Sequence, residues 1–264
     1  MKKRIVTIAL VIALLAMCFA GTYAYLSDTD YAVNTMTYGN VTIEQYEYER
    51  KPGVVYNATL GADGLQAFTQ NQKIYPSVLK VEDGYTLPND KNEGIKWGDY
   101  TYTGTSWDTI FNPARVANAM DKFVFVKNTG SEDLYFRTIV AVECPEGWEC
   151  GDCGMGDEVG VILGGQYKDN TLGYAYIDGV RYQFFEFTYK DGRILASGAQ
   201  AHPSLLQVLL HHKLGNEDLK KLGDTLDVLV MTQAVQAKGF DNMDQALTLA
   251  FGKLTAEAAA ELFD

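Results

Sequence analysis

Three of the four cysteines lie close together, in the glycine-rich stretch ECPEGWECGDCGMG of residues 143–156. Cys144, Cys150 and Cys153 follow the spacing C-x5-C-x2-C. A C-x-x-C pair is the common half of a zinc site, and Cys144 with a histidine would complete four ligands. The same cysteines would otherwise form one disulfide with one thiol left over, or remain free thiols. The choice among these outcomes depends on the compartment in which the chain resides.

Histidines offer little further metal chemistry. The chain has only three of them, His202, His211 and His212. Neighbouring residues of a strand point to opposite faces, so His211 and His212 do not readily bind one ion together. A zinc site needs three or four converging ligands. We therefore interpret these histidines as polar residues at the surface or at a strand end.

No catalytic motif stands out in the sequence. It contains no H-E-x-x-H, no glycine-rich phosphate loop and no G-x-S-x-G. The acidic groups at 28–30 and 217–218 lack the spaced ligands and turn glycine of a calcium-binding EF-hand loop. We expect Arg137 to form a salt bridge on the solvent face of a strand. The sequence thus predicts no catalytic residue and no cofactor, with zinc and calcium as the alternatives.

The first 24 residues have the pattern of a signal peptide. Lys2, Lys3 and Arg4 precede an uncharged, apolar run over residues 5–20. The stretch Thr22-Tyr23-Ala24 is similar to an A-x-A cleavage site, which predicts a cut after Ala24 and a mature chain that begins at Tyr25. Two alternatives are an uncut anchor, since the run approaches the ~20 residues that cross a bilayer, and lipidation at Cys18.

Export decides how the cysteines and the charge are interpreted. An oxidising compartment favours a disulfide within the cysteine-rich loop over a zinc site. The whole chain has 22 basic and 34 acidic residues, and removing the three basic residues of the signal leaves 19 against 34. Such an acidic surface argues against nucleic acid and anionic lipid as partners. We expect a secreted protein, extracellular or at the cell surface, that touches the membrane only through an uncleaved signal segment.

The elements that position these residues are predicted to be strands. Residues 40–48 alternate in polarity, and 123–126 and 134–142 are interpreted as a hairpin joined by residues 128–131, in which Gly130 takes a positive φ. The runs 174–177 and 180–188 flank Asp178-Gly179, a signal for a type I′ turn, with 193–196 as a third strand of a meander. Residues 205–210 and 226–235 are further apolar strands, the second of them central.

Helices are predicted only in connections and near the end of the chain: a turn or two over residues 217–222, and two helices within residues 241–264. Asn242 is a cap residue with Gln245 at the capping-box position, apolar residues follow at helical spacing, and Gly252 ends the helix. A second short helix is expected over 256–263. No repeat or linker divides the chain. We therefore predict one all-β domain over residues 25–264, a jelly-roll-like β-sandwich with insertions at 53–107 and 144–165 and short C-terminal helices.

Several stretches resemble one known family. These are GTYAYLSDTDYAVNTMTYGNVTIE (21–44), KFVFVKNTGSEDLYFRTIVAVE (122–143), SLLQVLLHH (204–212) and LDVLVMTQAVQAKGFDNMDQALTLAFG (226–252). They are similar to the TasA/camelysin family of exported Gram-positive proteins. The resemblance covers most of the mature chain outside the insertions, and its motifs are structural rather than catalytic.

This resemblance implies an extracellular jelly-roll subunit of biofilm-matrix fibres, released by a dedicated signal peptidase. Its partner would be a second copy or a related matrix subunit. Members of the family polymerise by donating the strand that follows the cleavage site to the next subunit. In this chain the donor would be residues 25–38, with Val33, Thr35 and Thr37 along one side.

Two other functions remain as alternatives. One is a secreted, monomeric surface-binding module. The other is a metallopeptidase, since camelysin is classed as one, although this sequence lacks any recognised zinc-peptidase motif. Filaments would favour the fibre subunit, and chelator-sensitive cleavage of casein would favour the peptidase.

Overall fold

The protein is described from a computed structural model. The residues that it describes are 34–51, 64–69, 85–86, 96–97, 100–101, 119–152, 158–211, 214, 218, 220–222 and 226–263. The signal segment, Tyr25, Val33 and most of the first insertion lie outside these ranges. None of the helices in the described part of the chain is long and apolar enough to cross a membrane.

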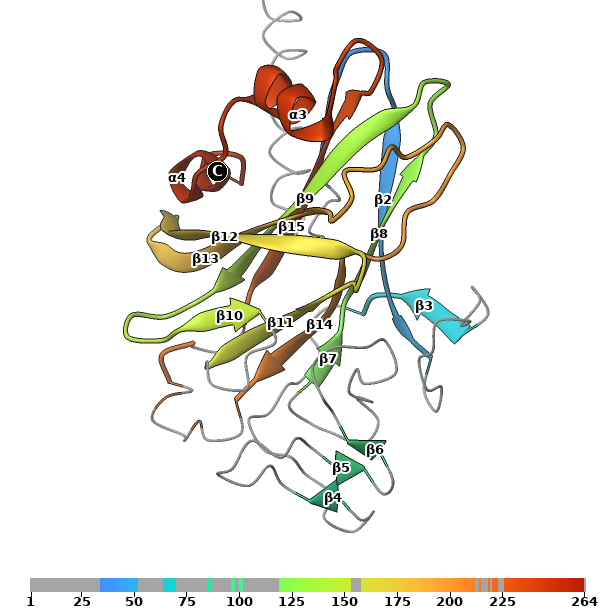
Figure 1. Ribbon diagram of the computed structural model, residues 1–264. Helices are drawn as coiled ribbons and strands as arrows, with labels where there is room; N and C mark the ends of the chain where they lie inside the picture. Colours follow the sequence, from blue (N-terminus) through green and yellow to red (C-terminus); the bar gives the residue numbers. More distant parts are fainter. Residues whose placement is uncertain are drawn as a thin grey trace, which may run out of the picture.

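Two layers of strands make up the fold (Figure 1). The first layer is a five-stranded sheet, whose strands in spatial order are β1 (Asn34–Tyr38), β15 (Val228–Gln236), β9 (Leu134–Glu143), β13 (Val180–Tyr189) and β12 (Tyr167–Ile177). β1 runs parallel to β15, and the other neighbours are antiparallel. The predicted all-β sandwich is thereby confirmed.

The second layer contains two smaller sheets. One has the order β10 (Cys150–Asp152), β11 (Val159–Leu163), β14 (Leu205–Leu210) and β7 (Ala119–Asp121). The other has the order β3 (Leu65–Ala67), β2 (Ile43–Arg50) and β8 (Phe123–Asn128). Only Lys122 separates β7 from β8, so one run of chain belongs to both sheets. In the first insertion, β4 (Tyr85–Thr86), β5 (Lys96–Trp97) and β6 (Tyr100–Thr101) form a further small antiparallel sheet.

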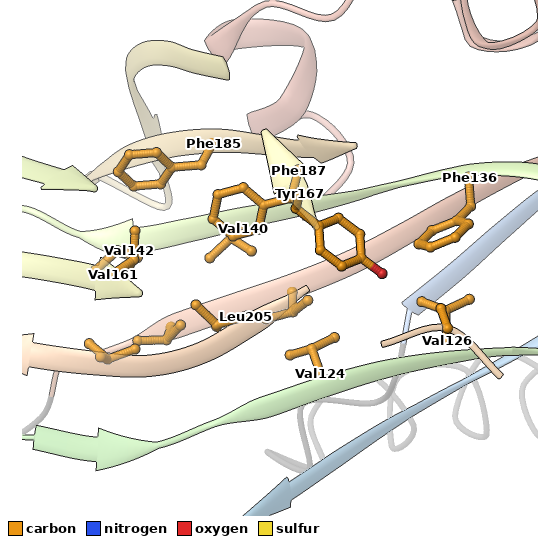
Figure 2. Close-up of a cluster of buried hydrophobic side chains, with 14 of the residues drawn as sticks. Val124, Val126, Phe136, Val140, Val142, Val161, Tyr167, Phe185, Phe187 and Leu205 are labelled. Carbon is orange, nitrogen blue, oxygen red and sulfur yellow. The ribbon is translucent and has the colours of Figure 1, made fainter. Parts of the chain in front are cut away.

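The main core fills the space between the two layers. Figure 2 shows apolar side chains of β8, β11 and β14 facing those of β9 and β13. Tyr167 lies among them, stacked on Tyr189 with ring centroids 4.7 Å apart, and its hydroxyl donates a hydrogen bond to the His202 carbonyl at 2.6 Å. Burial of this apolar surface is the main stabilising contribution to a sandwich of this kind.

Two C-terminal helices cover the outer face of the five-stranded sheet. α3 (Met243–Phe251) packs on Tyr135 and Val235, and α4 (Ala256–Ala260) packs on Ile139 and Phe184. The Asn242 side chain accepts a hydrogen bond from the Gln245 N–H at 2.9 Å, and Gly252 ends α3 at a φ of 78°. The helix predicted from these caps is confirmed. Since both faces of β9 are covered, all ten of its residues are buried.

The predicted hairpin of 123–126 with 134–142 is wrong. β8 pairs with β2, whereas β9 pairs with β13 and β15, so residues 128–131 carry the chain from one layer to the other. Gly130 does not have the positive φ that we expected. It is needed for space, because a Cβ there would lie 2.9 Å from the backbone nitrogen of Thr42.

The second predicted turn has the expected geometry. Asp178 and Gly179 have φ values of 48° and 80°, as a type I′ turn requires, and they join β12 to β13. The third strand of the predicted meander is wrong. Residues 193–196 form no strand, and Leu195 makes only an isolated bridge to Leu134.

Candidate assembly site

β1 lies at one edge of the five-stranded sheet. It contains Thr35 and Thr37 of the predicted donor strand, while Val33 lies outside the described residues. Its register with β15 runs from Asn34 opposite Met231 to Tyr38 opposite Val235. Residues 35–40 are all exposed. The backbone ladder is therefore the main described attachment of β1, with little burial of its own side chains to stabilise it.

Two side-chain contacts add to this ladder. Met36 Sδ accepts a hydrogen bond from the Gln233 amide at 3.5 Å, and the Tyr38 ring meets the edge of Phe251 at 6.4 Å between centroids. Both Met36 and Tyr38 are nevertheless large and exposed. The first three residues of β15, Val228 to Val230, have no described strand on that side. A longer strand than β1 would therefore fit along the β15 edge.

The interior next to β1 is polar. The Thr232 hydroxyl, opposite Thr35 in the register, donates a 2.6 Å hydrogen bond to Gln45 Oε1. Gln45 Nε2 and Thr138 Oγ1 are buried and have no hydrogen-bond partner among the described residues. Each such orphaned group costs roughly 1–3 kcal/mol. This seam of Gln45, Thr138 and Thr232 is less stabilised than the apolar core farther inside.

Arg137 lies on the outer face of β9 and links three strands. Its Nε donates to Gln233 Oε1 at 2.7 Å, and its Nη1 donates to Glu186 Oε1 at 3.0 Å. Burial lowers the pKa of Arg137, and the Glu186 carboxylate opposes this effect. The predicted salt bridge exists, but its expected place on a solvent face is wrong, because Arg137 is only 3% exposed on a face that also carries α3 and α4.

The cysteine-rich loop contains a disulfide between Cys144 and Cys150. Both cysteines belong to the buried core. The Arg181 guanidinium donates hydrogen bonds to the carbonyls of Cys144 and Pro145 and stacks 3.6 Å from the Tyr174 ring centroid. Arg181 thus ties this loop to the β12–β13 hairpin.

Among the described residues, the other predicted metal ligands do not converge. Cys153 and His212 lie outside the described residues. Within the described ranges, no group of three histidine, cysteine or acidic side chains is arranged to hold a metal ion. His202 and His211 have interactions of their own.

A buried ion pair at the base of the first insertion was not predicted. Arg50 ends β2, before the insertion, and Asp121 ends β7, after it. Arg50 donates from Nε and Nη2 to the two carboxylate oxygens of Asp121 at 2.5 and 2.7 Å, and Gln207 Nε2 donates to Asp121 Oδ1 at 2.7 Å. The sequence signal for this ion pair was the presence of opposite charges, Arg50 and Asp121, on either side of the long insertion.

Glu143 and Asp227 form an acidic pair at the end of β9. Glu143 is 8% exposed, and its carboxylate accepts a hydrogen bond from the Asp227 N–H at 3.1 Å. Burial raises the pKa of Glu143 to about 7, an effect that this hydrogen bond opposes. The sequence pattern places Glu143 just beyond the end of a strand and does not indicate its burial.

Ala24 and Tyr25, the predicted cleavage site, lie outside the described residues. Comparisons of the chain with protein-family models, with curated proteins and with solved structures found no match. The expected family relationship therefore depends on the sequence motifs alone.

Proposed function

We propose that the chain is a secreted structural protein, a subunit of extracellular or biofilm-matrix fibres that assemble by exchange of the β1 strand. The partner is a second copy or a related matrix subunit. The observation that carries this proposal is the state of β1, an uncharged and exposed strand held at a sheet edge mainly by its backbone.

Edge strands of soluble proteins are normally protected by charge, proline or a bulge. The sequence of β1, NTMTY, has none of these features. The seam of Gln45, Thr138 and Thr232 lowers the cost of removing β1, because two of its polar groups lack partners in the described structure. An exchanged β1 would form the same backbone ladder on a neighbouring molecule, so little enthalpy is lost while a link between subunits is gained.

Cleavage of the signal peptide would control this exchange. Residues 25–33 connect β1 to the predicted signal segment, and a strand tied to an uncut membrane anchor cannot reach another molecule in a fibre. We therefore propose that signal peptidase releases an assembly-competent subunit outside the cell.

A truncation tests the proposal. Mature protein starting at Tyr25 should form filaments visible by electron microscopy, whereas protein lacking residues 25–38 should remain folded and monomeric. The exposed Ile194→Ser substitution is a control that leaves residues 25–38 in place, and this variant should still assemble. Filaments from the truncated protein would disprove strand exchange. A mature chain that stays monomeric and retains a glycan or host protein would favour the binding module.

A further inference from the structure

The opposite edge of the five-stranded sheet is also open. β12 has β13 as its only strand neighbour in the described chain. A bulge between Thr171 and Gly173 interrupts the first half of β12, and Lys168 and Asp169 add charge there. Bulges and charges protect an edge from pairing. The second half, Gly173–Ile177, has neither and pairs regularly with β13.

The backbone of this second half has groups that point away from β13. Ile177 and Val180 flank the type I′ turn and therefore form a hydrogen-bonded pair. Hydrogen-bonded and non-hydrogen-bonded pairs alternate along an antiparallel ladder. Tyr176 and Tyr174 are consequently the residues whose N–H and C=O groups face the open edge. Their side chains are 56% and 38% exposed.

The two edges of the sheet match in direction and length. β1 is parallel to β15, and the successive antiparallel pairings from β15 through β9 and β13 make β12 run opposite to β1. A second copy placed beside the first in the same sheet would therefore bring its β1 antiparallel to β12. β1 has five residues, and so does the regular part of β12, Gly173–Ile177.

The side chains of the two edges also suit one another. Thr35 is on the inner face of the sheet, because it is opposite Thr232, whose hydroxyl bonds to Gln45 inside the sandwich. Tyr174 is on the same face, because it is opposite Gln183, which is two residues before the inward-facing Phe185. Thr35 and Thr37 would thus lie on the same face as Tyr174 and Tyr176 of the neighbouring copy. Pairs of aromatic and β-branched residues stabilise adjacent strands.

Some charged groups near the two edges are of opposite sign. Asp178 is exposed beside the β12 edge, and Glu146, 4.0 Å from the Arg181 guanidinium, bonds to the Tyr176 hydroxyl. Exposed lysines accompany the β1 edge: Lys238 follows β15, and Lys253 follows the helix whose Phe251 contacts Tyr38. Opposite charges on different surfaces favour head-to-tail contact over contact between like surfaces.

We infer that residues 173–177 of β12 form a second contact between subunits, in which they pair with the outer edge of a β1 strand that already lies beside β15 of another copy of this chain. The inference rests on the proposed fibre function and adds a surface that joins subunits to the exchange of β1 itself. Because the two edges differ and lie on opposite sides of the sheet, the contact is heterologous, and it extends into an open filament when the rotation between copies does not close into a ring.

Position-specific cross-linking tests this second contact. The photoreactive amino acid p-benzoylphenylalanine replaces Tyr176, and mature chains labelled with ¹⁴N and ¹⁵N are mixed before assembly. Illumination of the filaments should join residue 176 of one isotope to residues 34–38 of the other. Filaments whose cross-links from residue 176 lead elsewhere would overturn this second contact and leave the fibre function intact. A chain that forms no filaments would overturn the fibre function itself.

Two variants give an independent measurement. Tyr176→Pro removes an N–H that faces solvent in the monomer, a position at which an edge strand tolerates proline, and Tyr176→Lys adds a charge to the same edge. Each should raise the critical concentration for assembly by about tenfold or more, because edge charge and proline block strand pairing. Ile194→Lys is the control, since Ile194 is 46% exposed and lies outside both edges. Unchanged assembly of folded Tyr176→Lys protein, with thermal unfolding as the check of folding, would contradict the inference.

Discussion

Gly130 and Arg137 each depend on a contact with a distant part of the chain. A Cβ on Gly130 would lie 2.9 Å from the Thr42 backbone nitrogen, so this position needs glycine for space and not for the positive φ that the sequence predicts. Arg137 was correctly assigned a salt bridge, yet its surroundings include α3, more than a hundred residues later, whose Phe251 ring centroid lies 5.9 Å from the guanidinium. Local pattern identifies such residues, whereas only tertiary contacts decide their surroundings.

Replacing Gly130 should therefore destabilise the protein by sterics. Gly130→Ala places a Cβ 2.9 Å from the Thr42 nitrogen, so backbone must shift. We expect the free energy of unfolding to fall by about 1–3 kcal/mol, as in other overpacked sites. Denaturant unfolding measures this change, with the exposed Ser131→Ala as the neighbouring control. Equal stability of Gly130→Ala and wild type would argue against the close approach.

Glu143 should make stability depend on pH. Its pKa is about 7 in the folded protein against an ordinary value of 4.5, so the folded state binds the proton more tightly. The free energy of unfolding should consequently decrease as pH rises from about 4.5 to about 7. Glu143→Gln keeps an acceptor for the Asp227 N–H and cannot ionise.

At pH 8, Glu143→Gln should be more stable than wild type by about 1–2 kcal/mol, after allowance for solvent screening. Denaturant unfolding at pH 5 and pH 8 checks this, with Glu261→Gln as an exposed control. If the free energy of unfolding decreases equally for the variant and the wild type between these pH values, burial of the Glu143 carboxylate is not the cause of the pH dependence.

At the scale of elements, the sequence identified the longer strands and the two described C-terminal helices, but it missed β10, β11 and the short strands β3 to β7, and it did not identify all the strand partners. The β12–β13 hairpin was predictable because Asp178-Gly179 specifies both a turn and its register. Residues 128–131 also have turn composition, yet they connect two layers, because β8 and β9 pair with strands distant in sequence. Period-two patterns indicate which side of a strand is buried, and they do not identify its neighbour.

The disulfide should stabilise the loop that precedes β10 without controlling assembly. Cys144 and Cys150 enclose a short loop in the buried core. Replacing both by alanine should lower the free energy of unfolding by about 2 kcal/mol, near the lower end of typical values for disulfide removal. Filaments should still form, since β1 lies elsewhere in the fold and residues 173–177 of β12 are held in their sheet by backbone pairing with β13 rather than by the disulfide. Loss of filaments from a variant that remains folded would show that the loop takes part in assembly.

At the scale of the whole molecule, the two edges of one sheet differ from each other. β1 is short, uncharged and exposed, and β12 is open only beyond its bulge. The family resemblance indicated a donor strand over residues 25–38, and the fold places its last part, β1, at a sheet edge beside β15. The sequence did not predict the second edge, because only the fold places β12 at the side of the sheet opposite β1.

Static and dynamic light scattering of the mature chain is the measurement that tests assembly by exchange of β1. The same protein is prepared once with its N-terminus free at Tyr25 and once with a folded domain fused ahead of Tyr25, which mimics an uncut signal segment. If subunits assemble by exchange of β1, the free protein forms species whose mass increases steadily, and the fused protein stays monomeric. Cleavage of the fusion should then start assembly. Persistent monomer after cleavage, or equal growth with the fusion in place, would contradict assembly by exchange of β1.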